Sequence, residues 1–182
     1  TDVALVAPRL LIFGAVDFSA ALADAGRLLG YHVTVCDARA VFATPERFPG
    51  AHEVVRAWPH VYLGEAAVDE RTVVCVLTHD LKFDVPLLAL ALELPVAYVG
   101  AMGSRRTHER RMRALREHGV PESALERLHS PIGLDIGAST PAETAVSILA
   151  EVIAARGGAS GRSLTGTAGP IHRPTESVGV AG

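Results

Sequence analysis

The beginning of the chain constrains the fold more than any other part of it. Residues 9–14 (RLLIFG) form a short apolar run, residues 17–29 have the composition of a helix, and residues 32–37 (HVTVCD) form a second apolar run. Asp17 is a candidate N-cap for the helix, and Gly30 is a candidate stop signal. A strand, a helix and a second strand in this order predict the first unit of a parallel α/β sheet.

The rest of the chain continues this alternation of strands and helices. We expect strands over 72–78 and 95–100, and helices over 85–94, 104–118, 121–128 and 140–156. The unbroken β-branched run TVVCVLT is typical of a central strand. The chain is 49% hydrophobic but only 5% aromatic, so its core must be aliphatic. The pattern predicts an α/β fold with three layers, in which helices cover both faces of a doubly wound parallel sheet.

Two regions depart from this regular alternation. Residues 38–70 are interrupted by prolines, and we expect only one short extended piece there, WPHVYL. The helix over 140–156 has a strong start signal, because a hydroxyl at Ser139 or Thr140 precedes Pro141 and Glu143 at the capping-box spacing.

The composition also limits the class of protein. The net charge of −3 gives no reason to expect a nucleic-acid or membrane-surface protein, and no apolar stretch reaches the roughly 18 residues of a membrane span. Cys36 and Cys75 lie within apolar runs and suggest no disulfide framework, so we expect a cytoplasmic protein. Because the sequence becomes rich in Gly, Ser, Thr and Pro, we expect one domain over 1–157 and a flexible tail over 158–182.

The first strand–helix turn is a degenerate dinucleotide site. Gly14 is followed by Ala-Val-Asp-Phe-Ser, so Val16 and Ser19 stand where glycines would be expected, and Asp17 would repel a phosphate. Asp37 lies where an acidic residue can bind ribose hydroxyls, although it could equally pair with Arg39 in a loop. The turn is either a modified ligand site or one wall of a crevice that binds its ligand elsewhere.

A stronger anion signal follows the fourth predicted strand. Glycines at 100 and 103 precede a helix that begins at Ser104 and carries Arg105 and Arg106 in its first turn. Two arginines oppose the helix dipole there, a cost that an incoming anion would offset. We therefore expect Gly100, Gly103, Ser104, Arg105 and Arg106 to bind an anion, and we expect Arg111 and the later arginines to lie on a solvated face.

Two further loops carry polar residues. His79 and Asp80 follow the central strand and are candidate ligand contacts or structural groups, and Lys82 could add a positive charge. With Asp80 and Asp84 near His79, the loop could hold a metal, but no closely spaced second His or Cys supports one. Asp135, between two glycines, either closes over the same ligand or holds a turn. We find no nucleophile system and no Walker loop, and we predict no catalytic or metal-ligating residue.

Together these stretches resemble a known family. GYHVTVCDARAVFATPERFP, VLTHDLKFD, YVGAMGSRRTHERR and HSPIGLDIGASTPAETAVSILAEVIAAR are similar to the C-terminal Rossmann-like domain of the XdhC/CoxI family, over about residues 9–156. These proteins are accessory factors for xanthine dehydrogenase and related molybdenum hydroxylases. The family usually has a smaller, cysteine-bearing N-terminal domain that is absent from this sequence, so we expect either a fragment or a stand-alone version of the second half.

The resemblance implies a chaperone that binds molybdenum cofactor (molybdopterin), protects it while it gains its terminal sulfur, and delivers it to an apo-enzyme. The implied partners are a molybdenum hydroxylase apo-enzyme and a sulfur-donating enzyme, with a homodimer possible and with no nucleic acid or membrane. The alternatives are an oxidoreductase domain that binds NAD(P) or FAD, and a Rossmann-like module that binds no ligand and docks on a partner. The predicted cofactor contacts are Gly14, Asp37, Arg39, His79, Asp80, Gly100, Gly103, Ser104, Arg105, Arg106 and Asp135.

Overall fold

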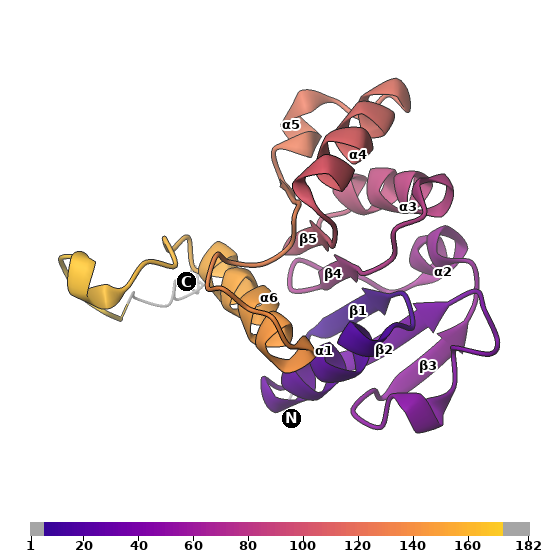
Figure 1. The fold of residues 1–182 in the computed structure, drawn as a ribbon, viewed down its shortest axis with the longest axis horizontal. Helices are drawn as coiled ribbons and strands as arrows, with labels where there is room; N and C mark the ends of the chain where they lie inside the picture. Colours follow the sequence, from indigo (N-terminus) through magenta and orange to yellow (C-terminus); the bar gives the residue numbers. More distant parts are fainter. Residues whose placement is uncertain (1–5, 173–182) are drawn as a thin grey trace, which may run out of the picture.

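A six-stranded parallel sheet forms the centre of the molecule (Figure 1). The computed structural model describes residues 6–172. The strands lie in the order β3-β2-β1-β4-β5-β6, with the bounds β1 (Arg9–Phe13), β2 (His32–Asp37), β3 (Glu53–Arg56), β4 (Val73–Val76), β5 (Tyr98–Ala101) and β6 (Leu128–His129). This order reverses between β1 and β4, which is the arrangement of dinucleotide-binding α/β domains and leaves a crevice beyond the carboxyl ends of those strands.

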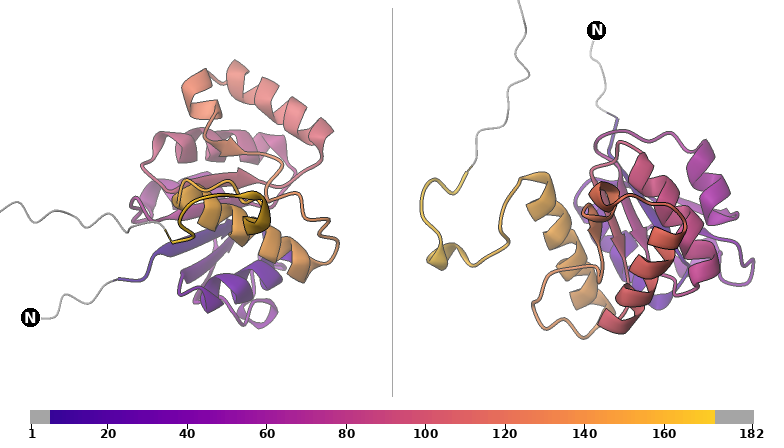
Figure 2. Two further views of the ribbon diagram at one scale, coloured as in Figure 1. Left: turned by 90° about the vertical axis from the view of Figure 1, so that its left-hand side faces the viewer. Right: turned by 90° about the horizontal axis from the view of Figure 1, so that it is seen from above.

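Helices cover both faces of the sheet, which confirms the predicted three-layer α/β fold (Figures 1 and 2). One face carries α1 (Asp17–Leu28) and α6 (Pro141–Arg156). The opposite face carries α2 (Pro59–Glu65), α3 (Leu81–Glu93), α4 (Arg105–Glu117) and α5 (Glu122–Leu125). Two short 3-10 turns, η1 (Pro45–Arg47) and η2 (Leu164–Gly166), lie in loops.

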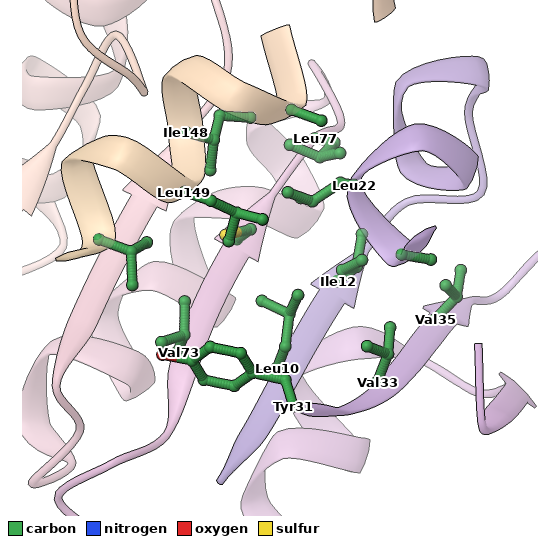
Figure 3. Close-up of a cluster of buried hydrophobic side chains, with 14 of the residues drawn as sticks. Leu10, Ile12, Leu22, Tyr31, Val33, Val35, Val73, Leu77, Ile148 and Leu149 are labelled. Atoms are coloured by element: carbon green, nitrogen blue, oxygen red, sulfur yellow. The ribbon is translucent and has the colours of Figure 1, made fainter. Parts of the chain in front are cut away.

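Alternate residues of each central strand belong to two separate cores. Leu10 and Ile12 of β1 pack under α1 and α6, where they meet Leu22 and Ile148 (Figure 3). Leu11 and Phe13 belong to the core on the other face. Because both faces are covered, β4 is apolar throughout and β1 is apolar after Arg9, so periodicity alone could not show which face each residue takes.

Besides the turn η1, residues 38–70 contain a helix and a strand that the sequence did not predict. The segment WPHVYL is wrong as an extended piece, because Pro59 occupies the first position of α2, where its missing N–H costs nothing. Strand β3 lies just before it and is only partly buried. Edge strands of this kind have a weak apolar signal, since one side of the strand has no neighbour.

The ends of several helices also differ from prediction. Helix α3 begins at Leu81, four residues earlier than expected, because Asp80 Oδ1 caps it by accepting the N–H of Lys82 at 3.1 Å. The N-cap of α1 is Val16 and not Asp17. The predicted helix over 121–128 is only α5, and its last predicted residue already belongs to β6.

Two predicted helix boundaries are confirmed. Gly30 follows the C-cap of α1 with a φ of 86°. The capping box of α6 is formed by Thr140 and Glu143, each of which accepts the other's backbone N–H. Residues 158–172 are exposed and lead away from the sheet (Figure 2). The remaining parts of the predicted domain and tail, residues 1–5 and 173–182, lie outside the described residues.

Candidate functional site

A cavity of about 400 Å³ lies where the first four strands end. Gly14 follows β1, Asp37 ends β2, Trp58 lies just after β3, and Thr78 lies just after β4, and all four residues line it. We call it the ring cavity. A more open hollow of about 730 Å³ lies between α3 and α5, away from the carboxyl ends of the strands. Because ligands of open parallel sheets bind at those carboxyl ends, the ring cavity is the better candidate site.

The first turn, between β1 and α1, is closed by its own hydrogen bonds. The N–H of Ala15 donates to Asp37 Oδ2 at 2.8 Å, and the hydroxyl of Ser19 donates to the carbonyl of Gly14. Gly14 is required there because its φ is 114° and a Cβ would lie 2.7 Å from Cγ2 of Thr78. The glycine therefore permits close packing of two turns, and the amide that a phosphate would use is already occupied.

Asp37 is buried and fully hydrogen-bonded. Its Oδ1 accepts the backbone N–H and the Nε of Arg39 at 2.8 and 3.0 Å, and its Oδ2 accepts Arg39 Nη2 and the Ala15 N–H, both at 2.8 Å. These four bonds fill the roughly four acceptor sites of a carboxylate. Burial alone would raise the pKa of Asp37, but the bonds from Arg39 and Ala15 hold it below its ordinary value. Asp37 therefore pairs with Arg39, which is one of the two alternatives that the sequence left open. A contact between Asp37 and a ribose would require breaking this pair.

The turn between β4 and α3 is different, because its buried carboxyl is left partly unsatisfied. Asp84 is 1% exposed and lines the ring cavity. Its Oδ1 accepts the Thr78 hydroxyl, while within residues 6–172 its Oδ2 has no hydrogen-bond partner. Burial raises the pKa of Asp84, against the opposing effects of the Thr78 hydroxyl and the Arg111 charge.

An aromatic pair forms another wall of the ring cavity. The rings of Trp58 and Phe83 stack with their centroids 5.2 Å apart and their planes 18° from parallel. Trp58 is 53% exposed, which is high for an indole. The ring cavity therefore combines a flat apolar surface with a buried carboxyl, a combination suited to a planar polar ring.

A second, more polar cavity of about 650 Å³ adjoins the first and shares His79 and Asp80 with it. Lys82 of α3 and Arg110 of α4 also line this second cavity, which we call the basic cavity. The structure therefore brings Gly14, Asp37, Arg39, His79 and Asp80 of the predicted set to one crevice.

The other predicted contacts lie outside both cavities. Among the described lining residues of the two cavities, none comes from the segment 100–106 or from Asp135. Ser104 caps α4 by accepting the N–H of Thr107, and Arg105 and Arg106 are exposed at the helix start. Gly100 is buried against Ile132, which a Cβ would approach to 2.7 Å. Asp135 is exposed in the loop before α6.

Arg111 corrects the expectation of a solvated helix face. It is 0% exposed, and it donates from Nη2 to the Met102 carbonyl at 2.9 Å and from Nη1 to Ser130 Oγ at 3.1 Å. Its charge acts on Asp84, and burial lowers the pKa of its guanidinium. Arginines are spread around this helix on more than one face, so the sequence does not single out the one that faces inward.

Sequence reasoning left Trp58, Phe83 and Arg110 out of the site. Two signals could have found the two aromatic residues. The Asp80 cap places Phe83 in the first turn of α3, and a proline directly after Trp58 marks a helix start at the sheet edge. Among residues 6–172 we find no group of three or more His, Cys, Asp or Glu side chains that could hold a metal ion. None of the helices in this part of the chain is long and apolar enough to cross a membrane.

Comparison with known proteins assigns the family. Residues 10–152 match the family described as the XdhC Rossmann domain. The chain is 33% identical over 149 residues to a probable xanthine dehydrogenase subunit of Bacillus subtilis, covering 82% of this chain and 43% of that protein. It is 37% identical over 91 residues to the molybdenum cofactor insertion chaperone PaoD of Escherichia coli, covering 50% and 29% respectively.

A solved structure agrees with this assignment. The crystal structure of a xanthine dehydrogenase from Bacillus halodurans matches with a TM-score of 0.71 and 30% sequence identity, over 82% of this chain and 44% of that one. The chain spans less than half the length of each of these three proteins. Its sequence, its strand order and its matched residues place the chain in the XdhC family, as a Rossmann domain of that family.

Proposed function

We propose that this chain serves the maturation of xanthine dehydrogenase-type molybdenum hydroxylases by holding molybdenum cofactor (molybdopterin) as cargo for delivery to the apo-enzyme. A relative named as a molybdenum cofactor insertion chaperone supports this role. The observation that carries the proposal is the pairing of the ring cavity with the basic cavity along one crevice. A cofactor with a flat ring system at one end and a phosphate at the other fits such a pair.

The residues present fit both ends of this cargo. Asp84 offers an unpartnered buried oxygen, and Trp58 offers a flat apolar surface, at the ring end. Lys82 and Arg110 line the basic cavity, where they can neutralise a phosphate. Arg105 and Arg106, at the exposed start of α4, remain proposed contacts for the same anion.

A dinucleotide-binding oxidoreductase domain is the second candidate function. The strand order favours it, because NAD(P) and FAD bind at this switch point in related folds. The first turn argues against it, since Asp37 already occupies the Ala15 amide and is itself filled by Arg39. A dinucleotide would have to displace this pair before its pyrophosphate could approach the backbone.

Delivery requires partners, and we propose three. The apo-enzyme of a molybdenum hydroxylase would accept the cofactor, and a sulfur-donating enzyme would modify it while it is held. A second copy of the chain is the third proposed partner.

Thermal unfolding with added ligands tests the proposal. We expect molybdenum cofactor, added without oxygen at about 100 times its Kd, to raise the free energy of unfolding by about 2.7 kcal/mol, and NAD, NADP and FAD to have no effect. The double variants Lys82→Ala/Arg110→Ala and Arg105→Ala/Arg106→Ala should each weaken binding severalfold, whereas Arg113→Ala on the same helix should not. A shift with NAD and none with molybdenum cofactor would overturn the proposal.

A further inference from the structure

Asp84 is the strongest sign of a specific ligand contact. Its side chain is buried at 1% exposure, it lines the ring cavity, and one of its two oxygens has no partner among the described residues. Buried polar atoms are nearly always hydrogen-bonded, so such an exception requires an explanation. A donor supplied by a ligand would complete the hydrogen bonding of this carboxyl.

Trp58 independently indicates a flat ligand. It begins α2 as its N-cap residue, stacks on Phe83 and still leaves 53% of its surface exposed at the ring cavity. An exposed indole that already stacks on a neighbouring ring gives a ligand a rigid stacking surface at low entropic cost. The cavity volume of about 400 Å³ lies in the range of small-molecule sites and can admit a fused two-ring heterocycle.

We propose that this turn recognises the amide-like edge of a pterin ring, with Asp84 accepting a ring N–H or amino hydrogen and Trp58 stacking on the ring system. The edge of a pterin carries an amino group beside a ring N–H, so it presents donors to an acceptor. The choice of a pterin among flat heterocycles rests on the proposed function. Guanine carries the same edge, whereas adenine places an acceptor beside its amino group.

The binding of a free pterin tests this inference without molybdenum or phosphate. The probe is 6-hydroxymethylpterin, followed by the anisotropy of its own fluorescence on adding the intact chain. The single tryptophan of the chain is Trp58, so quenching of its emission reports a ring at that wall. We expect saturable binding with quenching, no binding of adenosine, and weaker binding of guanosine.

Substitutions then separate the two contacts. Asp84→Asn should weaken pterin binding at least tenfold, and Trp58→Leu should weaken it fivefold or more, while Trp58→Phe retains an aromatic surface and should stay within threefold of wild type. Asp24→Asn, an exposed carboxyl on α1, is the matched control and should bind normally. Thermal unfolding of each variant confirms that the fold is intact.

Each result decides between the inference and the proposed function. Absence of pterin binding, or unchanged binding in both Asp84→Asn and Trp58→Leu, overturns the inference, even if molybdenum cofactor still stabilises the chain. Tighter binding of guanosine than of pterin reassigns the site to a nucleotide and overturns it as well. Pterin binding that depends on both residues, with no stabilisation by molybdenum cofactor, supports the inference and contradicts the proposed function.

Discussion

Two aspartates at the same edge of the sheet have opposite surroundings. Asp37, beside the first turn, accepts four hydrogen bonds and has a pKa below its ordinary value. Asp84, beside the turn after β4, accepts one hydrogen bond within residues 6–172 and has a raised pKa. Both are buried and both line the ring cavity.

The difference shows how a dinucleotide frame can be turned to another ligand. Arg39 and Ala15 satisfy Asp37 from within the protein, which removes the first turn from use by a phosphate. The unsatisfied oxygen lies instead at the turn after β4, which is where we propose that the ligand binds. The predictions below test this contrast, from the largest expected effect to the smallest.

Arg111→Met should have the largest effect on stability. The change removes a buried charge beside Asp84 and leaves the carbonyl of Met102 and the hydroxyl of Ser130 without their donor. Leaving the carbonyl and the hydroxyl without their donor costs about 1–3 kcal/mol for each group, which chemical denaturation would measure. Arg113→Met, on the exposed face of the same helix, should change stability by less than about 0.5 kcal/mol. Equal losses in the two variants would refute a special role for the inward-facing arginine.

Asp37→Asn should destabilise the chain by about 2–3 kcal/mol, because charge-assisted hydrogen bonds to Arg39 are lost or weakened in a buried setting. Since its pKa is lowered in the folded protein, Asp37 stabilises the fold above its unfolded pKa, and this contribution disappears as the pH falls through the folded pKa. Urea titrations at several pH values should therefore show the two proteins converging in acid. Asp17→Asn, with its side chain 93% exposed, is the control. A constant gap across pH would contradict this explanation.

Gly14→Ala should cost about 1–3 kcal/mol, since it combines a positive φ with a clash against Cγ2 of Thr78. Gly30→Ala has a similar positive φ but no atom within 4 Å, so it isolates the backbone contribution. Thr78→Ser removes the clashing methyl group and keeps the hydroxyl on Asp84, and it should restore part of the loss in a double variant. Thermal unfolding of Gly14→Ala, Gly30→Ala, Thr78→Ser and the double variant would measure these changes in stability. Identical losses for the two glycine variants would rule out the clash.

Asp84→Asn should change stability least in acid, where the wild-type carboxyl is neutral in both states, and its signature is a pH dependence. A raised pKa means that the folded protein retains a proton that the unfolded chain has released. Wild type should therefore lose stability relative to Asp84→Asn as the pH rises from the ordinary aspartate range to the folded pKa, by at most about 1.4 kcal/mol per pH unit. Calorimetry across this window would measure it, and a difference of opposite sign would show that the carboxyl is stabilised as an anion.

The sequence predicted the fold well because its main signals are local. Apolar runs such as TVVCVLT, the glycine after α1 and the capping box at Thr140 each act within a few residues, and the structure confirms them. Strand β3 was not predicted because it lies at the edge of the sheet and is only partly buried. Helix α2 was not predicted because its first residue is a proline, which can mark either a loop or a helix start.

The site was predicted less completely, because it depends on contacts between distant segments. His79 and Asp80 could be placed at the crevice because they follow the predicted central strand. The roles of Asp84 and Arg111 could not be predicted in this way. The packing of α4 near α3 determines whether the carboxyl finds hydrogen-bond partners and whether the arginine is buried. Trp58 joins the site only because β3 returns the chain to the same edge.

Carboxyl carbon NMR titration tests the contrast between the two aspartates most directly. We expect Asp37 to titrate below the ordinary aspartate range and Asp84 above it. Adding 6-hydroxymethylpterin should lower the pKa of Asp84, because a donated N–H favours the anion, and should leave that of Asp37 unchanged. Ordinary pKa values for both groups, or a ligand-induced shift at Asp37 alone, would contradict the view that the first turn is closed and the turn after β4 is open to ligand.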